Sequence, residues 1–413
     1  MENNTLIKTD RPIKWVKNRF RKDVLEEEIL KDFDVNEIAE VYNFQKTHSS
    51  FTHTPLNKLE ALASYLNVKE IFVKDESLRF GLNAFKVLGG IYAMAKYIAN
   101  QINVPIAELS FDKLKSAEIK YQLGDLTFIS ATDGNHGRGV AWAARELGYK
   151  SVIYMPKGSS QQRLDAIRNE VAVAEIQNVN YDETVRICAQ LAEQNGWVMV
   201  QDTAWDGYEE IPLWIMQGYS GMAQEIVEQL RTYGSLPTHV FLQAGVGSFA
   251  AGIAGYLLRV YGEKAPKIVV VEPNQADCYY QSFISPEGTR EFVTGDMQTE
   301  MAGLACGEPN TKAFELLRAY SIGSFSCDDV ITGLGMRVYG NPLGDDPRVI
   351  SGESGAVTLG LLYYLKKFNQ DKEIIDDLGL DEHSSIVLIS TEGDTDEQNY
   401  RKIVWDGNLS YKE

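Results

Sequence analysis

Short apolar segments alternate with longer segments of helical periodicity along most of the chain. The apolar segments predict strands at 71–73, 126–130, 151–155, 171–176, 197–200, 239–243, 267–271 and 385–390. Between them, apolar residues follow the spacing of helices at 84–99, 138–147, 160–169, 181–194, 215–230 and 249–260. Because parallel strands need helical crossovers, this alternation predicts an α/β fold with parallel sheets.

The length and charge of the chain limit its organisation and its partners. A chain of 413 residues exceeds the size of one simple core, so we expect two domains or one domain with a large insertion. Its formal net charge of −18 would repel phosphates, which argues against nucleic acid or an anionic membrane as a partner. No apolar stretch approaches the length of a membrane span, and none has the flanks of a signal peptide.

The cysteines and histidines give no sign of a metal site. The four cysteines include no CxxC pair, and the five histidines form no HExxH pattern, so we expect no bound metal. Reduced thiols in a cytoplasmic protein are the default expectation. A bridge between Cys278 and Cys306 stays open at this stage.

Lys86 lies near the start of a predicted helix, in the segment Asn83-Ala84-Phe85-Lys86. Asn83 is a good N-cap, which would place Lys86 at the third helical position. There the helix dipole and the neighbouring apolar side chains both favour the neutral amine, the form that attacks a carbonyl group. The alternative is an ordinary lysine that extends into water.

A glycine-rich loop, Ala244-Gly245-Val246-Gly247-Ser248, joins the strand at 239–243 to the next helix. Successive amides and a helix N-terminus form a seat for a phosphate group. Gly245-x-Gly247-x-x-Ala250 also fits the dinucleotide pattern, with Glu272 in the approximate place of a ribose-binding acid. Phosphate binding, nicotinamide binding and a purely structural turn therefore all remain open.

A second polar turn, Thr132-Asp133-Gly134-Asn135-His136, follows the strand at 126–130. Strand-to-helix turns of this kind hold ligands in α/β proteins. Asn135 could hydrogen-bond a ligand oxygen, and the turn amides could hold a carboxylate. Alternatively, Asp133-Gly134 is only a tight turn with polar caps.

These motifs, together with Thr54-Pro55-Leu56 and Ser390-Thr391-Glu392-Gly393-Asp394, resemble the fold-type II pyridoxal-phosphate family in the family's order. The resemblance implies two parallel-sheet domains with pyridoxal 5'-phosphate in the cleft between them. It implies that Lys86 carries the cofactor as a Schiff base and that Asn135 faces its phenolic oxygen. The phosphate would lie on Gly245, Val246, Gly247 and Ser248. Thr391 would meet the ring nitrogen.

The resemblance also implies the domain division and a homodimer. Residues 89–214 would form the smaller domain, and residues 1–88 together with 215–413 would form the larger one.

Two acids narrow the expected activity. Asp133 stands where dehydratases of this family have a small neutral residue, and Asp202 adds a second carboxylate. The stretches 201–208, 211–212, 214–219, 301–305 and 351–355 resemble family members that eliminate ammonia from 2,3-diaminopropionate. A substrate with an ammonium on its β-carbon needs an anionic pocket, whereas a hydroxyl needs only hydrogen bonds.

The expected roles follow from this resemblance. Lys86 would be the base for one enantiomer and Asp133 the base for the other, while Asp202 would bind the β-amino group. The turn residues Thr132, Gly134 and His136 would contact the small amino-acid substrate. The alternatives are a serine or threonine dehydratase with the same cofactor, a nicotinamide-dependent dehydrogenase, and a cofactor-binding protein without catalysis.

Overall fold

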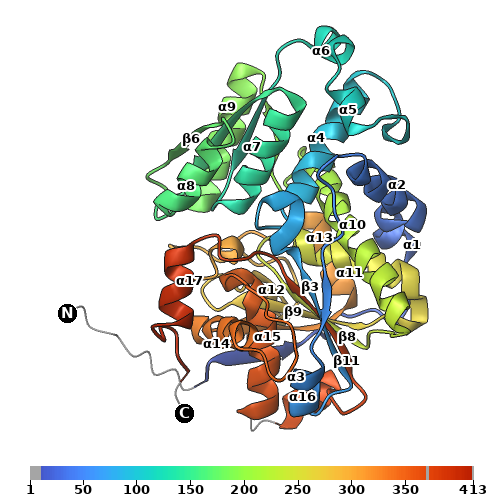
Figure 1. Cartoon of the computed structure of the whole chain (residues 1–413), viewed down its shortest axis with the longest axis vertical. Helices are drawn as coiled ribbons and strands as arrows, with labels where there is room; N and C mark the ends of the chain where they lie inside the picture. Colours follow the sequence, from blue (N-terminus) through green and yellow to red (C-terminus); the bar gives the residue numbers. More distant parts are fainter. Residues whose placement is uncertain (1–10, 369–371, 412–413) are drawn as a thin grey trace, which may run out of the picture.

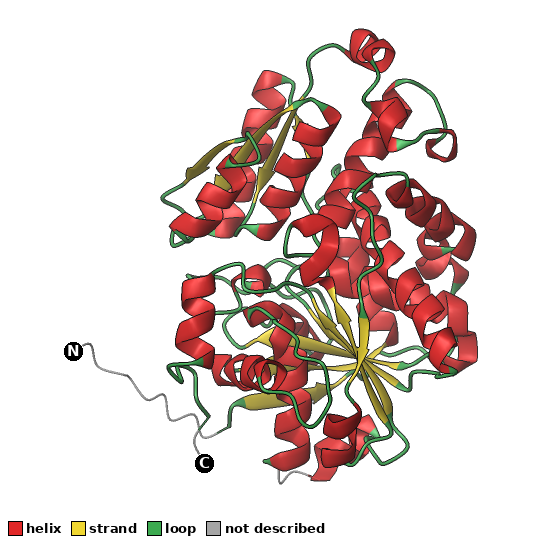
Figure 2. Ribbon diagram, in the orientation of Figure 1, coloured by secondary structure: helices red, strands yellow, loops and turns green. Residues whose placement is uncertain are grey.

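The computed structural model describes residues 11–368 and 372–411. It contains two β-sheets that are covered by helices (Figures 1 and 2), and every strand and helix predicted above is present. The α/β fold class is therefore confirmed.

The smaller sheet is entirely parallel and lies in the upper part of Figure 1. Its strands, in spatial order, are β6 (Val173–Ile176), β5 (Lys150–Met155), β4 (Thr127–Ala131) and β7 (Val198–Met199). The helices around it are α7 (Asn135–Leu147), α8 (Gln161–Arg168) and α9 (Tyr181–Asn195). Helices cover the central strands and exclude water from them, which suits their apolar side chains. Ile129 and Ile153 are fully buried.

The larger sheet is mixed rather than purely parallel. Its strands, in spatial order, are β1 (Ile13–Lys17), β10 (Ser321–Cys327), β9 (Lys267–Pro273), β8 (His239–Gln243), β11 (Ser385–Ser390), β3 (Glu70–Asp75) and β2 (Leu56–Lys58). The five inner strands are parallel, whereas β1 and β2 pair antiparallel at the two edges.

The sequence pattern did not predict β1, β2 or β10. Strand β10 is rich in small residues, and it is formed by its neighbours rather than by its own propensity. A Cβ at Gly323 would overlap the carbonyl oxygen of Val16 in β1, so this glycine allows the two strands to approach.

Helices α4 (Val87–Gln101) and α10 (Glu210–Tyr233) pack against each other between the two sheets (Figure 1). The contact is close, because a Cβ at Gly218 would lie 2.7 Å from the Cα of Gly89. Each helix crosses one of the predicted domain boundaries. The division into residues 89–214 and the remainder therefore stays a prediction.

The other helices cover the larger sheet and the outside of the molecule. They are α1 (Glu27–Leu30), α2 (Val35–Lys46), α3 (Glu60–Tyr65), α5 (Phe111–Leu114), α6 (Ala117–Leu123), α11 (Ser248–Tyr261), α12 (Cys278–Ile284), α13 (Thr311–Tyr320), α14 (Asp329–Gly340), α15 (Glu353–Lys367), α16 (Lys372–Leu378) and α17 (Glu397–Val404). Among the described residues, no helix is both long and apolar enough to cross a membrane.

Candidate active site

Lys86 immediately precedes α4, and the predicted helix start at Asn83 is wrong. Asn83 has a left-handed backbone with φ of 61°, and the helix begins at Val87. The segment before Lys86 pairs with the end of the chain: the amide of Phe85 donates to Thr391 O at 3.0 Å, and the amide of Gly393 donates to Asn83 O at 3.0 Å. This pairing keeps residues 83–85 out of the helix, and local sequence contains no sign of it.

The Lys86 amine is ion-paired in this structure, contrary to the expectation of a neutral amine. Its Nζ donates to Asp202 Oδ2 at 3.0 Å, and both side chains are largely buried. Burial lowers the pKa of Lys86, but the charge of Asp202 more than offsets this, so the pKa lies above its ordinary value. Burial likewise raises the pKa of Asp202, and Lys86 reverses the shift and lowers it to about 2.

The glycine loop lies against this ion pair. It leads from β8 into the N-terminus of α11, whose first amides have no partner within the helix. Ser248 Oγ donates to the carbonyl oxygen of Asp202 at 2.5 Å, which links the loop to the segment that carries the acid. Gly247 has φ of 91°, and a Cβ there would overlap the Tyr279 hydroxyl, so only glycine fits.

Glu272 does not serve as a ribose-binding acid. Its buried carboxylate accepts from the amides of Tyr279 at 2.7 Å and Tyr280 at 2.8 Å, and from Ser324 Oγ at 2.7 Å. These bonds satisfy the start of α12. Burial raises the pKa of Glu272 to about 8. The nicotinamide alternative thus loses the residue that made it specific.

The turn after β4 divides into a scaffold and a ligand-facing part. Thr132 Oγ1 accepts from the amides of Gly134 and Gly137, each at 2.9 Å, which shapes the turn. His136 is buried and its Nε2 donates to Val200 O at 2.8 Å. Thr132, Gly134 and His136 are not among the residues that line the pocket, and their substrate contacts stay a prediction.

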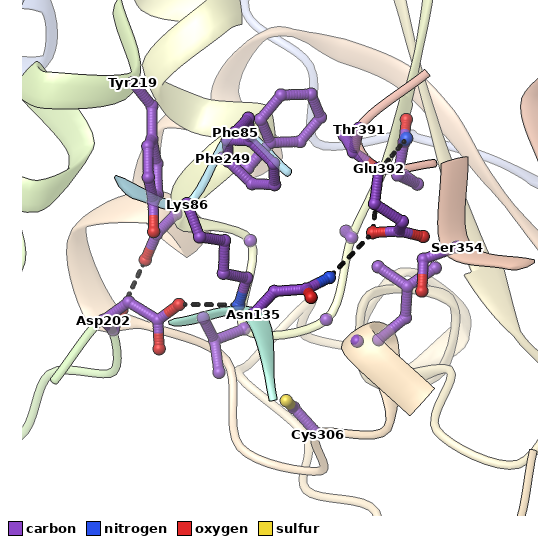
Figure 3. A pocket seen from close by; sticks show the side chains of 18 residues that line it. Phe85, Lys86, Asn135, Asp202, Tyr219, Phe249, Cys306, Ser354, Thr391 and Glu392 are labelled. Atoms are coloured by element: carbon purple, nitrogen blue, oxygen red, sulfur yellow. Dashed lines mark hydrogen bonds and ion pairs between the residues drawn. The ribbon is translucent and has the colours of Figure 1, made fainter. Parts of the chain in front are cut away.

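Asp133 and Asn135 extend from the same turn toward the larger sheet. Asn135 lines the pocket, and its Nδ2 donates to Glu392 Oε2 at 3.3 Å (Figure 3). A Cβ on the pocket-lining Gly303 would lie 3.6 Å from Asp133 Oδ2, which places this carboxylate at the pocket's edge.

The pocket wall around Thr391 contains a further acid, Glu392, for which the sequence predicted no role. Gln243 Nε2 donates to Thr391 Oγ1 at 3.1 Å, and Thr391 Oγ1 donates to Glu392 Oε2 at 3.4 Å. The amide of Gly355 also donates to Glu392, at 3.0 Å. Burial and the neighbouring Glu353 raise the pKa of Glu392 to about 7.

These elements enclose one pocket (Figure 3). It contains Lys86, Asn135, Asp202, Gly245, Val246, Gly247, Ser248 and Thr391 from the predicted set. It also contains residues without a predicted role, including Tyr219, Gly303, Cys306, Ser354 and Glu392. Tyr219, Gly303, Ser354 and Glu392 lie within sequence stretches that carried the resemblance, whereas Cys306 lies outside them and is placed by tertiary packing.

The model of one protein family, described as pyridoxal-phosphate dependent enzyme, matches residues 49–375. The chain belongs to the pyridoxal-phosphate-dependent enzyme family. The matched region holds nearly all of the pocket and ends before Thr391 and Glu392.

Individual members of this pyridoxal-phosphate-dependent family are also similar to the chain. Diaminopropionate ammonia-lyase of Escherichia coli (strain K12) is 52% identical over 365 residues, which cover 88% of this chain and 90% of that protein. The enzyme of the same name from Salmonella typhimurium is 50% identical over 370 residues, covering 89% and 92%. The crystal structure of holo diaminopropionate ammonia-lyase from Escherichia coli matches with a TM-score of 0.90 and 47% identity, covering 97% of this chain and 98% of that one.

The pocket fits the cofactor of the pyridoxal-phosphate-dependent family. The loop around Gly247 and the N-terminus of α11 form a seat for an anion. The hydroxyl of Tyr219 is buried on the pocket wall and has no hydrogen-bond partner among the residues that the structure describes. A bound polar group would complete such a site.

The cysteines near the pocket are free. All four cysteines belong to the described residues, and each is a buried thiol. Cys278 Sγ lies 3.9 Å from the carbonyl oxygen of Cys306, so the two residues are neighbours without a disulfide.

Proposed function

We propose that this enzyme eliminates the β-amino group of 2,3-diaminopropionate and that one water then converts the product to pyruvate and a second ammonia. The observation that carries the proposal is the buried carboxylate of Asp202 beside Lys86. An anion in this place suits a substrate whose leaving group is an ammonium. About half of the aligned residues are identical to those of two diaminopropionate ammonia-lyases, which supports the same substrate.

The residues proposed to hold the cofactor come from three elements. Lys86 would bind its aldehyde carbon, the loop from Gly245 to Ser248 its phosphate, and Asn135 and Thr391 its ring. Pyridoxal phosphate, when bound, supplies an electron sink for the negative charge that develops at the substrate's α-carbon.

The chain's own side chains would move the protons. Once its amine is neutral, Lys86 accepts the α-proton of one enantiomer, and Asp133, at the edge of the pocket, accepts that of the other. Asp202 would hold the β-ammonium, whose positive charge would keep this buried carboxylate ionised as the Lys86 ammonium does in this structure. The substrate ammonium would take the place beside Asp202 that the Lys86 ammonium occupies in this structure.

Pyruvate release tests this proposal. The purified protein is supplied with both enantiomers of 2,3-diaminopropionate and of serine, and its visible spectrum is recorded. We expect a cofactor band and kcat/KM at least about tenfold higher for a diaminopropionate enantiomer than for either serine, the ratio that corresponds to 1.4 kcal/mol. A preference for serine would instead identify a dehydratase.

Asp202→Asn tests the proposed role of that acid within the same assay. It should weaken use of diaminopropionate more than use of serine, because only the former brings an ammonium to this position. An unchanged ratio between the substrates would remove Asp202 from the β-amino site.

A cytoplasmic location and a homodimer also belong to the proposal. Four free thiols fit a reducing compartment. The homodimer is implied by the resemblance. Sedimentation equilibrium at a series of protein concentrations tests it, and a single species with the mass of one chain would contradict it.

A further inference from the structure

Arg163 joins the two sides of the cleft near the candidate base Asp133. It belongs to α8 beside the smaller sheet. Its Nη1 lies 3.9 Å from Asp133 Oδ2, and its Nη2 lies 3.8 Å from Oε2 of Glu353, the first residue of α15 beside the larger sheet. All three side chains are mostly buried, with exposed fractions of 14%, 18% and 5%. One guanidinium therefore stands between a carboxylate of each side.

The backbone around Asp133 leaves room for this arginine. Gly134 has φ of 155°, and a Cβ on it would lie 2.9 Å from Cδ of Arg163. The aliphatic part of Arg163 thus lies directly against the turn that carries Asp133. The start of α8 is fixed as well, because Ser160 Oγ accepts from the Arg163 amide at 3.2 Å.

The guanidinium has hydrogen-bonding capacity to spare. Its buried Nε has no acceptor within residues 11–368 and 372–411, and both ion-pair distances exceed the usual length of a charge-assisted hydrogen bond. Asn399 Nδ2 donates to Glu353 Oε1 at 2.7 Å, so the far carboxylate is held in place.

The surrounding charges argue against Arg163 as a binding group for the substrate carboxylate. Burial lowers the pKa of Arg163, but Asp133, Glu353 and Glu392 raise it above its ordinary value. The positive charge of this arginine is thus already balanced by acids of the protein. Its partners, rather than an incoming anion, explain its position.

We propose that Arg163 is a positioning residue for Asp133, holding that carboxylate toward the substrate face opposite Lys86 and tying it to Glu353 across the cleft. The inference rests on the proposed function, because it concerns the base for the D enantiomer of 2,3-diaminopropionate. Its consequence is selective. Loss of Arg163 should impair the D enantiomer, whose proton goes to Asp133, more than the L enantiomer, whose proton goes to Lys86.

The test compares Arg163→Gln, Arg163→Lys and the control Arg168→Gln in the full-length holoenzyme. Arg168 belongs to the same helix, but its Nε and Nη2 donate to Ala174 O inside the smaller sheet unit. We expect Arg163→Gln to lower kcat for the D enantiomer about tenfold more than for the L enantiomer, since a misplaced catalytic group costs up to about 100-fold. Arg163→Lys, which keeps the charge but not the geometry of the guanidinium, should lower the D-to-L ratio by only a few-fold.

A double variant separates positioning from general disruption. In Asp133→Asn protein, adding Arg163→Gln should cause little further loss with the D enantiomer, because both changes act through one carboxylate. Thermal unfolding of each variant shows whether the variant folds. If Arg163→Gln does not fold, Arg163→Lys serves as the test instead: a D-to-L ratio lowered by a few-fold supports the positioning role, and an unchanged ratio contradicts it.

Several outcomes would overturn the inference. They are equal losses for both enantiomers, a lysine variant no better than the glutamine variant, or the same D-to-L change in Arg168→Gln. A wild-type holoenzyme that releases no pyruvate from either enantiomer would overturn the proposed function itself. An active wild type with an unselective Arg163→Gln variant would overturn only the role of Arg163.

Discussion

Lys86 Nζ and Asp202 Oδ2 lie 3.0 Å apart, although 116 residues separate them in sequence. The pair joins the start of α4 to the loop after β7, and therefore one side of the cleft to the other. It also means that Lys86 enters any reaction with a carbonyl group as an ammonium that must first lose its proton.

Replacing Lys86 with alanine should abolish turnover and the visible band that borohydride bleaches. The reason is that alanine has no amine to bind the cofactor covalently. Absorption spectra before and after borohydride, together with pyruvate assays, measure both effects. Lys150→Ala is the control, because that side chain is 73% exposed and does not line the pocket. A Lys86→Ala protein with both properties intact would refute the assignment.

Asp202→Asn should shift the pH dependence of cofactor uptake by the apoenzyme. In the wild type, Asp202 holds the pKa of Lys86 above its ordinary value, so the reactive neutral amine appears only at high pH. Removing the carboxylate lowers that pKa, and we expect the midpoint of uptake to move about one to three units toward lower pH. Stopped-flow absorbance across a pH series provides the measurement.

Asp206→Asn is the matched control for this shift, since Asp206 is exposed and lies four residues along the chain from Asp202. Its uptake profile should coincide with that of the wild type. If Asp202→Asn also coincides with the wild type, the ion pair does not control the amine.

Asp133→Asn should reduce turnover of the D enantiomer far more than that of the L enantiomer. An amide cannot accept the α-proton, and a well-placed base contributes about 10²–10⁴-fold. Initial rates of pyruvate release from each enantiomer give the ratio. Equal losses would show that Asp133 is not a base specific to one face of the substrate.

The sequence predicted the parts of this site that belong to strand-to-helix connections. Lys86, Asn135, Asp202 and the glycine loop each follow a strand that could be recognised by its apolar pattern, and all line one pocket. Parallel strands bring such connections to one edge of each sheet, and the two edges face one pocket. The motifs alone left structural alternatives open, and the resemblance to a family assigned the roles.

The features that the sequence did not predict depend on partners distant along the chain. Residues 83–85 resemble the start of a helix, but pairing with residues 391–393 keeps them out of it. Arg163 resembles an ordinary helix residue until Asp133 and Glu353 are placed beside it. No local propensity contains this information, because tertiary contacts determine both the backbone and the charge balance.

Gly247→Ala should weaken cofactor binding by at least about tenfold, or 1.4 kcal/mol. The new Cβ would overlap the Tyr279 hydroxyl at a residue with φ of 91°, so the phosphate seat must deform. Gly234→Ala is the matched control, because Gly234 has φ of 65° with open space around its Cβ position. Fluorescence titration of both apoenzymes with pyridoxal phosphate measures the difference. Equal affinities would mean that the loop does not hold the phosphate.

Glu225→Leu should destabilise the fold, although Glu225 does not line the pocket. Glu225 is buried on α10 and accepts from Lys74 Nζ at 2.7 Å and Arg79 Nη1 at 2.8 Å, with both cations fully buried. Removing it leaves two buried cations with Glu76 as their remaining carboxylate, and breaking such a pair costs about 3–5 kcal/mol. Urea unfolding measures the loss.

Glu228→Leu is the control, because Glu228 lies one turn further along the helix and is partly exposed. It should change the free energy of unfolding by about 1 kcal/mol or less. Lys74 and Arg79 belong to the segment that leads to Lys86. Equal stability of the two variants would therefore show that this network does not anchor that segment to α10.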